Sequence, residues 1–72
     1  GLDRQVASWL LREATGDGAA VSQLTLARLL GARRTSVNQS LRRLEDRGLV
    51  ETGYRRIRVI DERTLQRLLN HG

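Results

Sequence analysis

The chain has 72 residues and a formal net charge of +5 at pH 7, and all 13 of its cationic residues are arginines. It has no cysteine, which excludes disulfides and thiolate metal sites, and no apolar run that approaches the roughly 20 residues of a membrane-spanning helix. A chain of this length buries only about 60% of its unfolded surface, so we expect one small domain, 1–72, with a thin core.

The first helix is predicted over residues 4–15, where apolar side chains recur at helical spacing after Asp3, the expected N-cap. The sequence GDG at 16–18 is typical of a turn. Residues 20–21 are expected to form a very short strand before the next helix.

Two further helices meet at a short turn. Ser22 is expected to cap the helix QLTLARLL, which Gly31 ends because glycine most easily adopts a left-handed backbone. A third helix is predicted over residues 34–47, and its inner face is formed by Val37, Leu41 and Leu44.

A β-hairpin and a short helix follow. The run LVETGYRRIRVI, residues 49–60, contains two β-prone segments around a turn. Tyr54 in this turn could stack on a sugar or cover the hairpin, and we expect the second. Asp61 is the expected cap of a last helix over 62–70. The order of elements predicts a mainly α fold with a small β-hairpin.

The most informative spacing is that of Ala27, Gly31 and Val37. Two helices that cross steeply need a small residue where they touch, a residue tolerant of positive φ at the corner, and a buried aliphatic anchor on the second helix. These three residues meet those needs in that order, as in the helix-turn-helix motif. With the hairpin directly after it, the sequence predicts a winged helix-turn-helix, a three-helix core with a wing and a short C-terminal helix.

Positive charge is concentrated in one part of the chain. Residues 28–58 hold nine arginines against three acidic residues, a net charge of +6. Such a basic surface is the electrostatic mark of a polyanionic partner. Because the second helix of a helix-turn-helix enters the major groove, we expect this partner to be double-stranded DNA.

The outward face of helix 34–47 is polar. With its apolar face buried, the residues that point away are Arg34, Thr35, Asn38, Gln39 and Arg42. Arginine can bond O6 and N7 of guanine, and asparagine or glutamine can pair with the edge of adenine. We therefore expect Arg34, Thr35, Asn38 and Gln39 to read bases.

Residues 22–68, SQLTLARLLGARRTSVNQSLRRLEDRGLVETGYRRIRVIDERTLQRL, resemble the C-terminal DNA-binding domain of the Crp/Fnr family of bacterial transcription regulators. The resemblance is carried by the LARLLG helix, the R-x-S-V start of the recognition helix, LRRLEDRGLV, and the closing I-x-V-I-D-x-x-x-L. It implies sequence-specific binding of double-stranded DNA, with helix 34–47 in the major groove and the wing on the DNA backbone.

The resemblance also implies a larger protein. Members of the family are homodimers with an N-terminal effector-binding β-roll and a long dimerisation helix, and this chain contains neither, so we expect it to be a C-terminal fragment that is monomeric alone. No cofactor is expected in this domain, whereas the N-terminal domain would take a cyclic nucleotide or another effector. The implied partners are a two-fold symmetric operator and RNA polymerase, with no membrane, in the bacterial cytoplasm at the nucleoid.

The recognition helix departs from the family pattern at several positions. Arg34 falls where the family's first base-reading arginine sits. Thr35 stands where many members have a glutamate that reads cytosine, and Gln39 where many have a second arginine, so the usual half-site of the family is not expected. Ser40 replaces a usual aliphatic residue, which is expected to weaken the packing of this helix slightly.

Phosphate contacts are expected from residues around the recognition helix, namely Ser22, Gln23, Arg33, Arg42, Arg43, Arg55 and Arg56. Ser22 and Gln23 lie at a helix N-terminus, where backbone N–H groups favour an anion. Arg33 occupies the place of a capping serine or threonine and is expected to reach a phosphate instead. Arg43 could equally pair with Asp46 or face solvent.

Catalysis and metal binding are not expected. The only histidine is His71, no cysteine is present, no paired carboxylates share an apolar helix face, and the glycines match no nucleotide-binding motif. The alternative function is a winged-helix protein-interaction module, which would be expected to lose the basic face. RNA binding would need another surface because the A-form major groove excludes a helix. A MarR-like regulator would keep the DNA partner and change the dimer.

Overall fold

The computed structural model of the protein describes residues 1–16 and 18–70, so Asp17 of the predicted turn and His71 lie outside it. The elements follow the order α1 (Leu2–Glu13), α2 (Gln23–Leu30), α3 (Arg34–Asp46), β1 (Val50–Gly53), β2 (Arg56–Val59) and α4 (Glu62–Asn70). This arrangement confirms the mainly α fold with a two-stranded hairpin.

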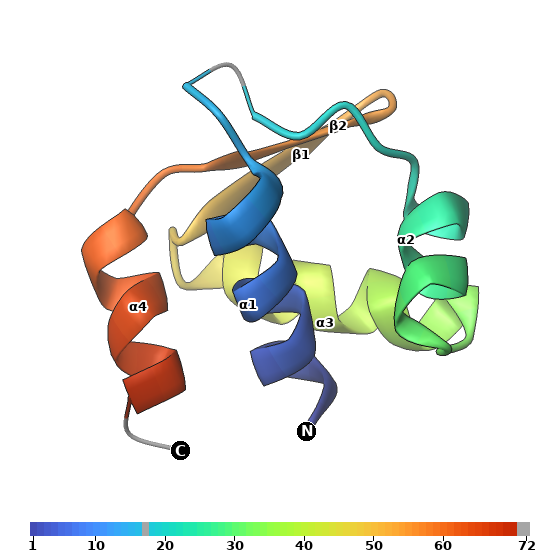
Figure 1. Ribbon diagram of the computed structural model, residues 1–72, viewed down its shortest axis with the longest axis horizontal. Coiled ribbons are helices and arrows are strands. Elements are labelled where there is room, and N and C mark those ends of the chain that lie inside the picture. The colour runs from blue at the N-terminus through green and yellow to red at the C-terminus, as the bar shows by residue number, and fades with distance from the viewer. Residues whose placement is uncertain (17, 71–72) are drawn as a thin grey trace.

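The helices enclose one core beneath the hairpin. Helices α1 and α4 lie side by side in opposite directions, α3 crosses near them, and the hairpin extends over the other end of the molecule (Figure 1). The buried side chains come from every helix and from the wing, and include Val6, Leu10, Leu26, Val37, Leu41, Leu44, Leu49, Ile57 and Leu65. Within the described residues no helix is long and apolar enough to cross a membrane.

Helix α1 differs from its prediction at both ends. It begins at Leu2 after Gly1, which makes no side-chain cap bond, and it ends at Glu13 instead of residue 15. The expectation that Asp3 is the N-cap is therefore wrong. Its carboxylate bonds to side chains of α3 instead, and that tertiary contact has no counterpart in the local pattern of the sequence.

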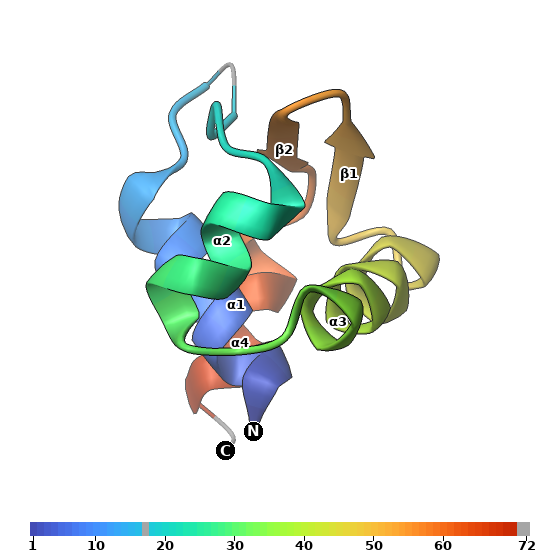
Figure 2. The ribbon, with the colours of Figure 1, turned by 90° about the vertical axis from the view of Figure 1, so that its right-hand side faces the viewer.

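The turn between α2 and α3 matches the predicted motif. The Oγ of Ser22 accepts a hydrogen bond from the backbone N–H of Thr25 at 3.1 Å, which caps α2. Gly31 ends the helix with φ of 67°, in the left-handed region that favours glycine. Ala27 is 2% exposed and Val37 is fully buried, so both belong to the core, as the motif requires. Figure 2 shows α2 and α3 side by side, joined by this turn, with α3 viewed nearly along its axis.

The hairpin is joined to the segment that precedes α2. Strands β1 and β2 pair antiparallel, and Ala19 forms an isolated bridge with Ile57, with N···O distances of 2.8 and 3.0 Å. The strand expected at residues 20–21 is therefore wrong and is replaced by this bridge. Gly18 makes the close approach possible, because its φ is 94° and a Cβ there would lie 2.7 Å from the carbonyl oxygen of Ile57.

The base of the wing is fixed to the end of α3. The Glu45 carboxylate accepts hydrogen bonds from the backbone N–H of Thr52 at 3.1 Å and from its hydroxyl at 3.2 and 3.3 Å. On the other side, Asp61 caps α4 as predicted, since its carboxylate accepts from the backbone N–H and the hydroxyl of Thr64. The bonds between Glu45 and Thr52 hold strand β1 against the end of α3.

Candidate nucleic-acid interface

A groove runs between the start of α2, the outer face of α3 and the tip of the wing. It has a volume of about 500 Å³ and is lined by Ser22, Gln23, Leu24, Arg34, Asn38, Gly53, Tyr54 and Arg55. Five of the residues predicted to contact DNA thus meet in one place, although the sequence distributes them over three elements. Its lining residues come from the start of α2, from α3 and from the turn of the hairpin, and Figure 2 shows how these three elements are arranged.

The outer face of α3 adjoins this groove. Arg34, Thr35, Asn38, Gln39 and Arg42 line a second hollow of about 430 Å³, and all of them except the half-buried Asn38 are exposed. The four residues predicted to read bases therefore lie on one face of one helix. An arginine stands at each end of this face, so positive charge brackets the amide and hydroxyl groups between them.

A hydrogen bond joins Asn38 on this face to Gln23 at the start of α2. Asn38 Nδ2 donates a hydrogen bond to Gln23 Oε1 at 2.6 Å, and both side chains are half-buried. The bond links the recognition helix to the first residue of α2, 15 positions earlier in the chain. Sequence reasoning placed Gln23 and Asn38 in separate groups and missed this contact.

The cations at the turn and at the wing tip are exposed. Arg33 is the N-cap of α3 and makes no side-chain cap bond there, as its lack of an acceptor predicts. Arg55 has a φ of 54° and its guanidinium lies 5.5 Å from the centre of the Tyr54 ring. Tyr54 is 88% exposed, so the expectation that it covers the hairpin is wrong. The two-residue turn leaves this side chain beyond the last paired residues of the strands.

The remaining wing arginines lie away from the groove. Arg56 and Arg58 alternate along β2 with the buried Ile57, which places them on the opposite face of the strand. Arg58 forms an ion pair with Glu51, its partner across the hairpin, at 3.2 Å. Arg56, predicted to bind phosphate, shares this outer side and does not line the groove.

Arg43 has a partner that the sequence did not indicate. Its guanidinium donates two hydrogen bonds to the carboxylate of Asp3, at 2.7 and 3.1 Å, so the pairing with Asp46 is wrong. Ser40, which is fully buried, donates to the same carboxylate at 2.6 Å. The structure therefore assigns Arg43, predicted as a phosphate contact, to a polar cluster of Asp3, Ser40 and Arg43 between α1 and α3.

This polar cluster gives Ser40 a role that the sequence did not indicate. The hydroxyl is buried with a charged acceptor, so the residue joins α3 to α1 by a hydrogen bond. The hydrogen bonds from Arg43 hold the pKa of the Asp3 carboxyl below its usual value, and the bond from Ser40 adds to this effect against the opposing effect of burial. Asp3 is therefore an anion throughout the physiological range.

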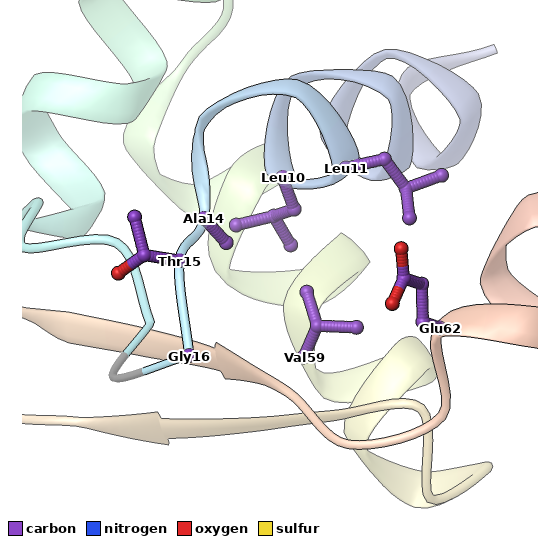
Figure 3. Close-up of a pocket in the computed structure, with 7 residues that line it drawn as sticks. All are labelled: Leu10, Leu11, Ala14, Thr15, Gly16, Val59 and Glu62. Atoms are coloured by element: carbon purple, nitrogen blue, oxygen red, sulfur yellow. The ribbon is translucent and has the colours of Figure 1, made fainter.

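A further hollow lies on the other side of the molecule. It is formed between the end of α1, the loop after it and the start of α4, where the side chains of Leu10, Leu11, Val59 and Glu62 gather (Figure 3). Its volume of about 250 Å³ is below the roughly 300–1,000 Å³ typical of small-molecule sites. Within residues 1–16 and 18–70, no group of three His, Cys, Asp or Glu side chains is placed to bind a metal ion.

The tight α2–α3 turn, the exposed polar face of α3 and the adjacent hairpin define a winged helix-turn-helix domain of the type found in transcription regulators. The protein belongs to the family of Crp-like helix-turn-helix domains, whose model matches residues 4–68.

Several bacterial regulators are similar to this chain. The chain is 40% identical over 65 residues to the HTH-type transcriptional regulator Cmr of Mycobacterium tuberculosis (strain CDC 1551 / Oshkosh), which covers 90% of this chain and 27% of Cmr. A CRP-family transcriptional regulator from Thermus thermophilus has a similar structure, with a TM-score of 0.82 and 28% identity over 97% of this chain and 40% of that one. The catabolite activator protein of Thermus thermophilus matches with a TM-score of 0.82 and 26% identity, over 96% of this chain and 34% of its own. The chain therefore spans less than half the length of each of these relatives.

Proposed function

We propose that this domain binds double-stranded DNA in a sequence-specific manner, with α3 in the major groove. The observation that carries the proposal is the joined surface of α3, α2 and the wing, on which Arg34 and Asn38 share a groove with the wing-tip Arg55. A major groove about 12 Å wide admits an α-helix, and the exposed face of α3 carries the side chains that bond base edges.

The contacts divide into two groups by their chemistry. Arg34, Thr35, Asn38 and Gln39 meet base edges and supply sequence preference. Phosphate is bound by the backbone N–H groups at the start of α2, beside Ser22 and Gln23, and by Arg33, Arg42 and Arg55. The second group supplies affinity that decreases with salt, because each neutralised phosphate releases counterions.

We propose that the native protein acts as a homodimer in the bacterial cytoplasm. Two copies of this domain would bind half-sites of a two-fold symmetric operator about 34 Å apart, one turn of the duplex. We further propose an effector-binding region elsewhere in the protein, for a cyclic nucleotide or another small molecule, and RNA polymerase as a partner at the promoter, because the resemblance of the sequence to the Crp/Fnr family implies both.

The test is a selection of bound duplexes from a random pool with the protein in its native length. We expect a two-fold symmetric motif, and Arg34→Ala should remove the preference at one position of each half-site at a cost of about 1–3 kcal/mol. Arg55→Ala is the matched control, which should weaken all duplexes alike and reduce the salt slope by about one. Failure to enrich any motif would contradict the proposal and favour a winged-helix protein-interaction module.

A further inference from the structure

The hydrogen bond between Gln23 and Asn38 constrains what α3 can present to a base. Asn38 Nδ2 donates to Gln23 Oε1 at 2.6 Å across the corner of the helix-turn-helix. Both side chains line the groove together with Arg34, so the bond lies within the surface proposed to face DNA. Half-burial of both residues limits the competition of water for this bond.

The chemistry of the amide decides what remains available on Asn38. A carboxamide has one carbonyl oxygen and two N–H groups. When the N–H trans to the carbonyl oxygen is donated to Gln23, the oxygen and the N–H cis to it remain as an acceptor and a donor side by side. That pair is the complement of N6–H and N7 of adenine in the major groove. With its oxygen free for the N6 amino group, the oriented side chain matches adenine better than any other base.

We propose that Asn38 reads an adenine and that Gln23 is a positioning residue, which holds the amide of Asn38 in the orientation required for that base. The inference rests on the proposed function of α3 in the major groove. Gln23 fixes the side chain before DNA arrives, so the rotational freedom of Asn38 is not lost at the moment of binding. The two N–H groups of Gln23 itself stay available for the nearby phosphate.

The experiment measures base preference separately from affinity. The protein in its native length is tested on the selected duplex, with each of the four base pairs at the position whose preference Asn38→Ala abolishes. We expect wild type to prefer adenine there by about 5- to 100-fold, and to lose part of this preference for 7-deazaadenine, which lacks N7. Gln23→Ala should reduce the adenine preference by about 3- to 10-fold, and should have no further effect on preference in the Asn38→Ala background.

Two variants separate positioning from phosphate binding. Gln23→Glu keeps an acceptor for Asn38 Nδ2 but adds negative charge, so it should retain the adenine preference while weakening all duplexes. Gln39→Ala is the matched control on the same face of α3. It should change the base preference at the position that Gln39 contacts and leave the preference for adenine at the Asn38 position unaltered. Circular dichroism of each variant establishes that the helices are intact.

The possible results have different consequences. A base other than adenine at the Asn38 position, or an equal loss on all duplexes with Gln23→Ala, would overturn this inference and leave the proposed DNA binding intact. If wild type selects no motif at all, the proposed function itself fails. An adenine preference that Gln23→Ala lowers and Gln23→Glu preserves is the supporting result.

Discussion

Replacement of Asp3 by alanine should destabilise the domain through a residue of α3. The Ser40 hydroxyl is fully buried and donates to the Asp3 carboxylate at 2.6 Å, so the substitution removes its acceptor. A buried polar group without a partner costs about 1–3 kcal/mol. The carbonyl of Ser36, one turn earlier in α3, offers an alternative acceptor, as serine hydroxyls in helices commonly bond to it. We therefore expect a loss of about 1–2 kcal/mol in the free energy of unfolding.

The assay is a double-mutant cycle of Asp3→Ala and Ser40→Ala, measured by thermal and urea unfolding of the 72-residue chain. For a domain of this size each kcal/mol corresponds to about 4–8 °C in Tm. Ser40→Ala should destabilise the protein when Asp3 is present, because a charge-assisted hydrogen bond is lost. In the Asp3→Ala background the same substitution should be nearly neutral, because the charged acceptor is already gone and the hydroxyl has only the Ser36 carbonyl left to bond. An effect of Ser40→Ala with the same sign and size in both backgrounds would refute the reasoning.

Further predictions concern acid stability and two backbone positions. The folded-state pKa of Asp3 lies below its ordinary value of 3.8, so its contribution to stability is present above that pH and is lost as the pH falls below it. Asp3→Asn should therefore make the free energy of unfolding depend less steeply on pH in acid. An unchanged slope would show that Asp3 does not contribute to the pH dependence. Gly18→Ala should cost about 1–3 kcal/mol in urea unfolding, because φ is 94° and the added Cβ would meet backbone atoms, whereas Gly16→Ala, with open space around it, should be nearly neutral. Arg55→Asn should raise stability by about 0.5–1 kcal/mol, since asparagine tolerates φ of 54° better, and should reduce the salt slope of DNA binding; a stability loss would show that the turn is not strained.

The elements that depend on local pattern could be predicted from the sequence. Gly31 ends α2 with a left-handed backbone, Ala27 and Val37 are buried in the core, and Asp61 caps α4. Each of these depends on neighbours within one or two helical turns, which periodicity and capping preferences reflect. The same kind of reasoning placed Arg34 and its neighbours on one exposed face of α3.

The parts that escaped prediction are contacts between residues far apart in the chain. Asp3 pairs with side chains of α3 that are 37 and 40 positions away, and a short polar residue at a helix start is read more easily as a cap. The hydrogen bond from Asn38 to Gln23 likewise joins residues of two different helices, α3 and α2. A strand bridge such as that of Ala19 needs only one residue, which is too short to produce an alternating pattern.

The polar cluster of Asp3, Ser40 and Arg43 attaches α3 to α1 near the middle of α3, so that a rotation of α1 would also move the start of α3. Ser40 lies six residues after Arg34, about 9 Å along the helix axis at 1.5 Å per residue. If α3 turns with α1 about this attachment, a rotation of about 10° moves the backbone at Arg34 by about 1.6 Å, since the arc is the product of radius and angle. A displacement of that size exceeds the tolerance of a hydrogen bond to a base edge. In the proposed complex with DNA, a change in the angle of α1 would therefore move Arg34 relative to the base that it contacts.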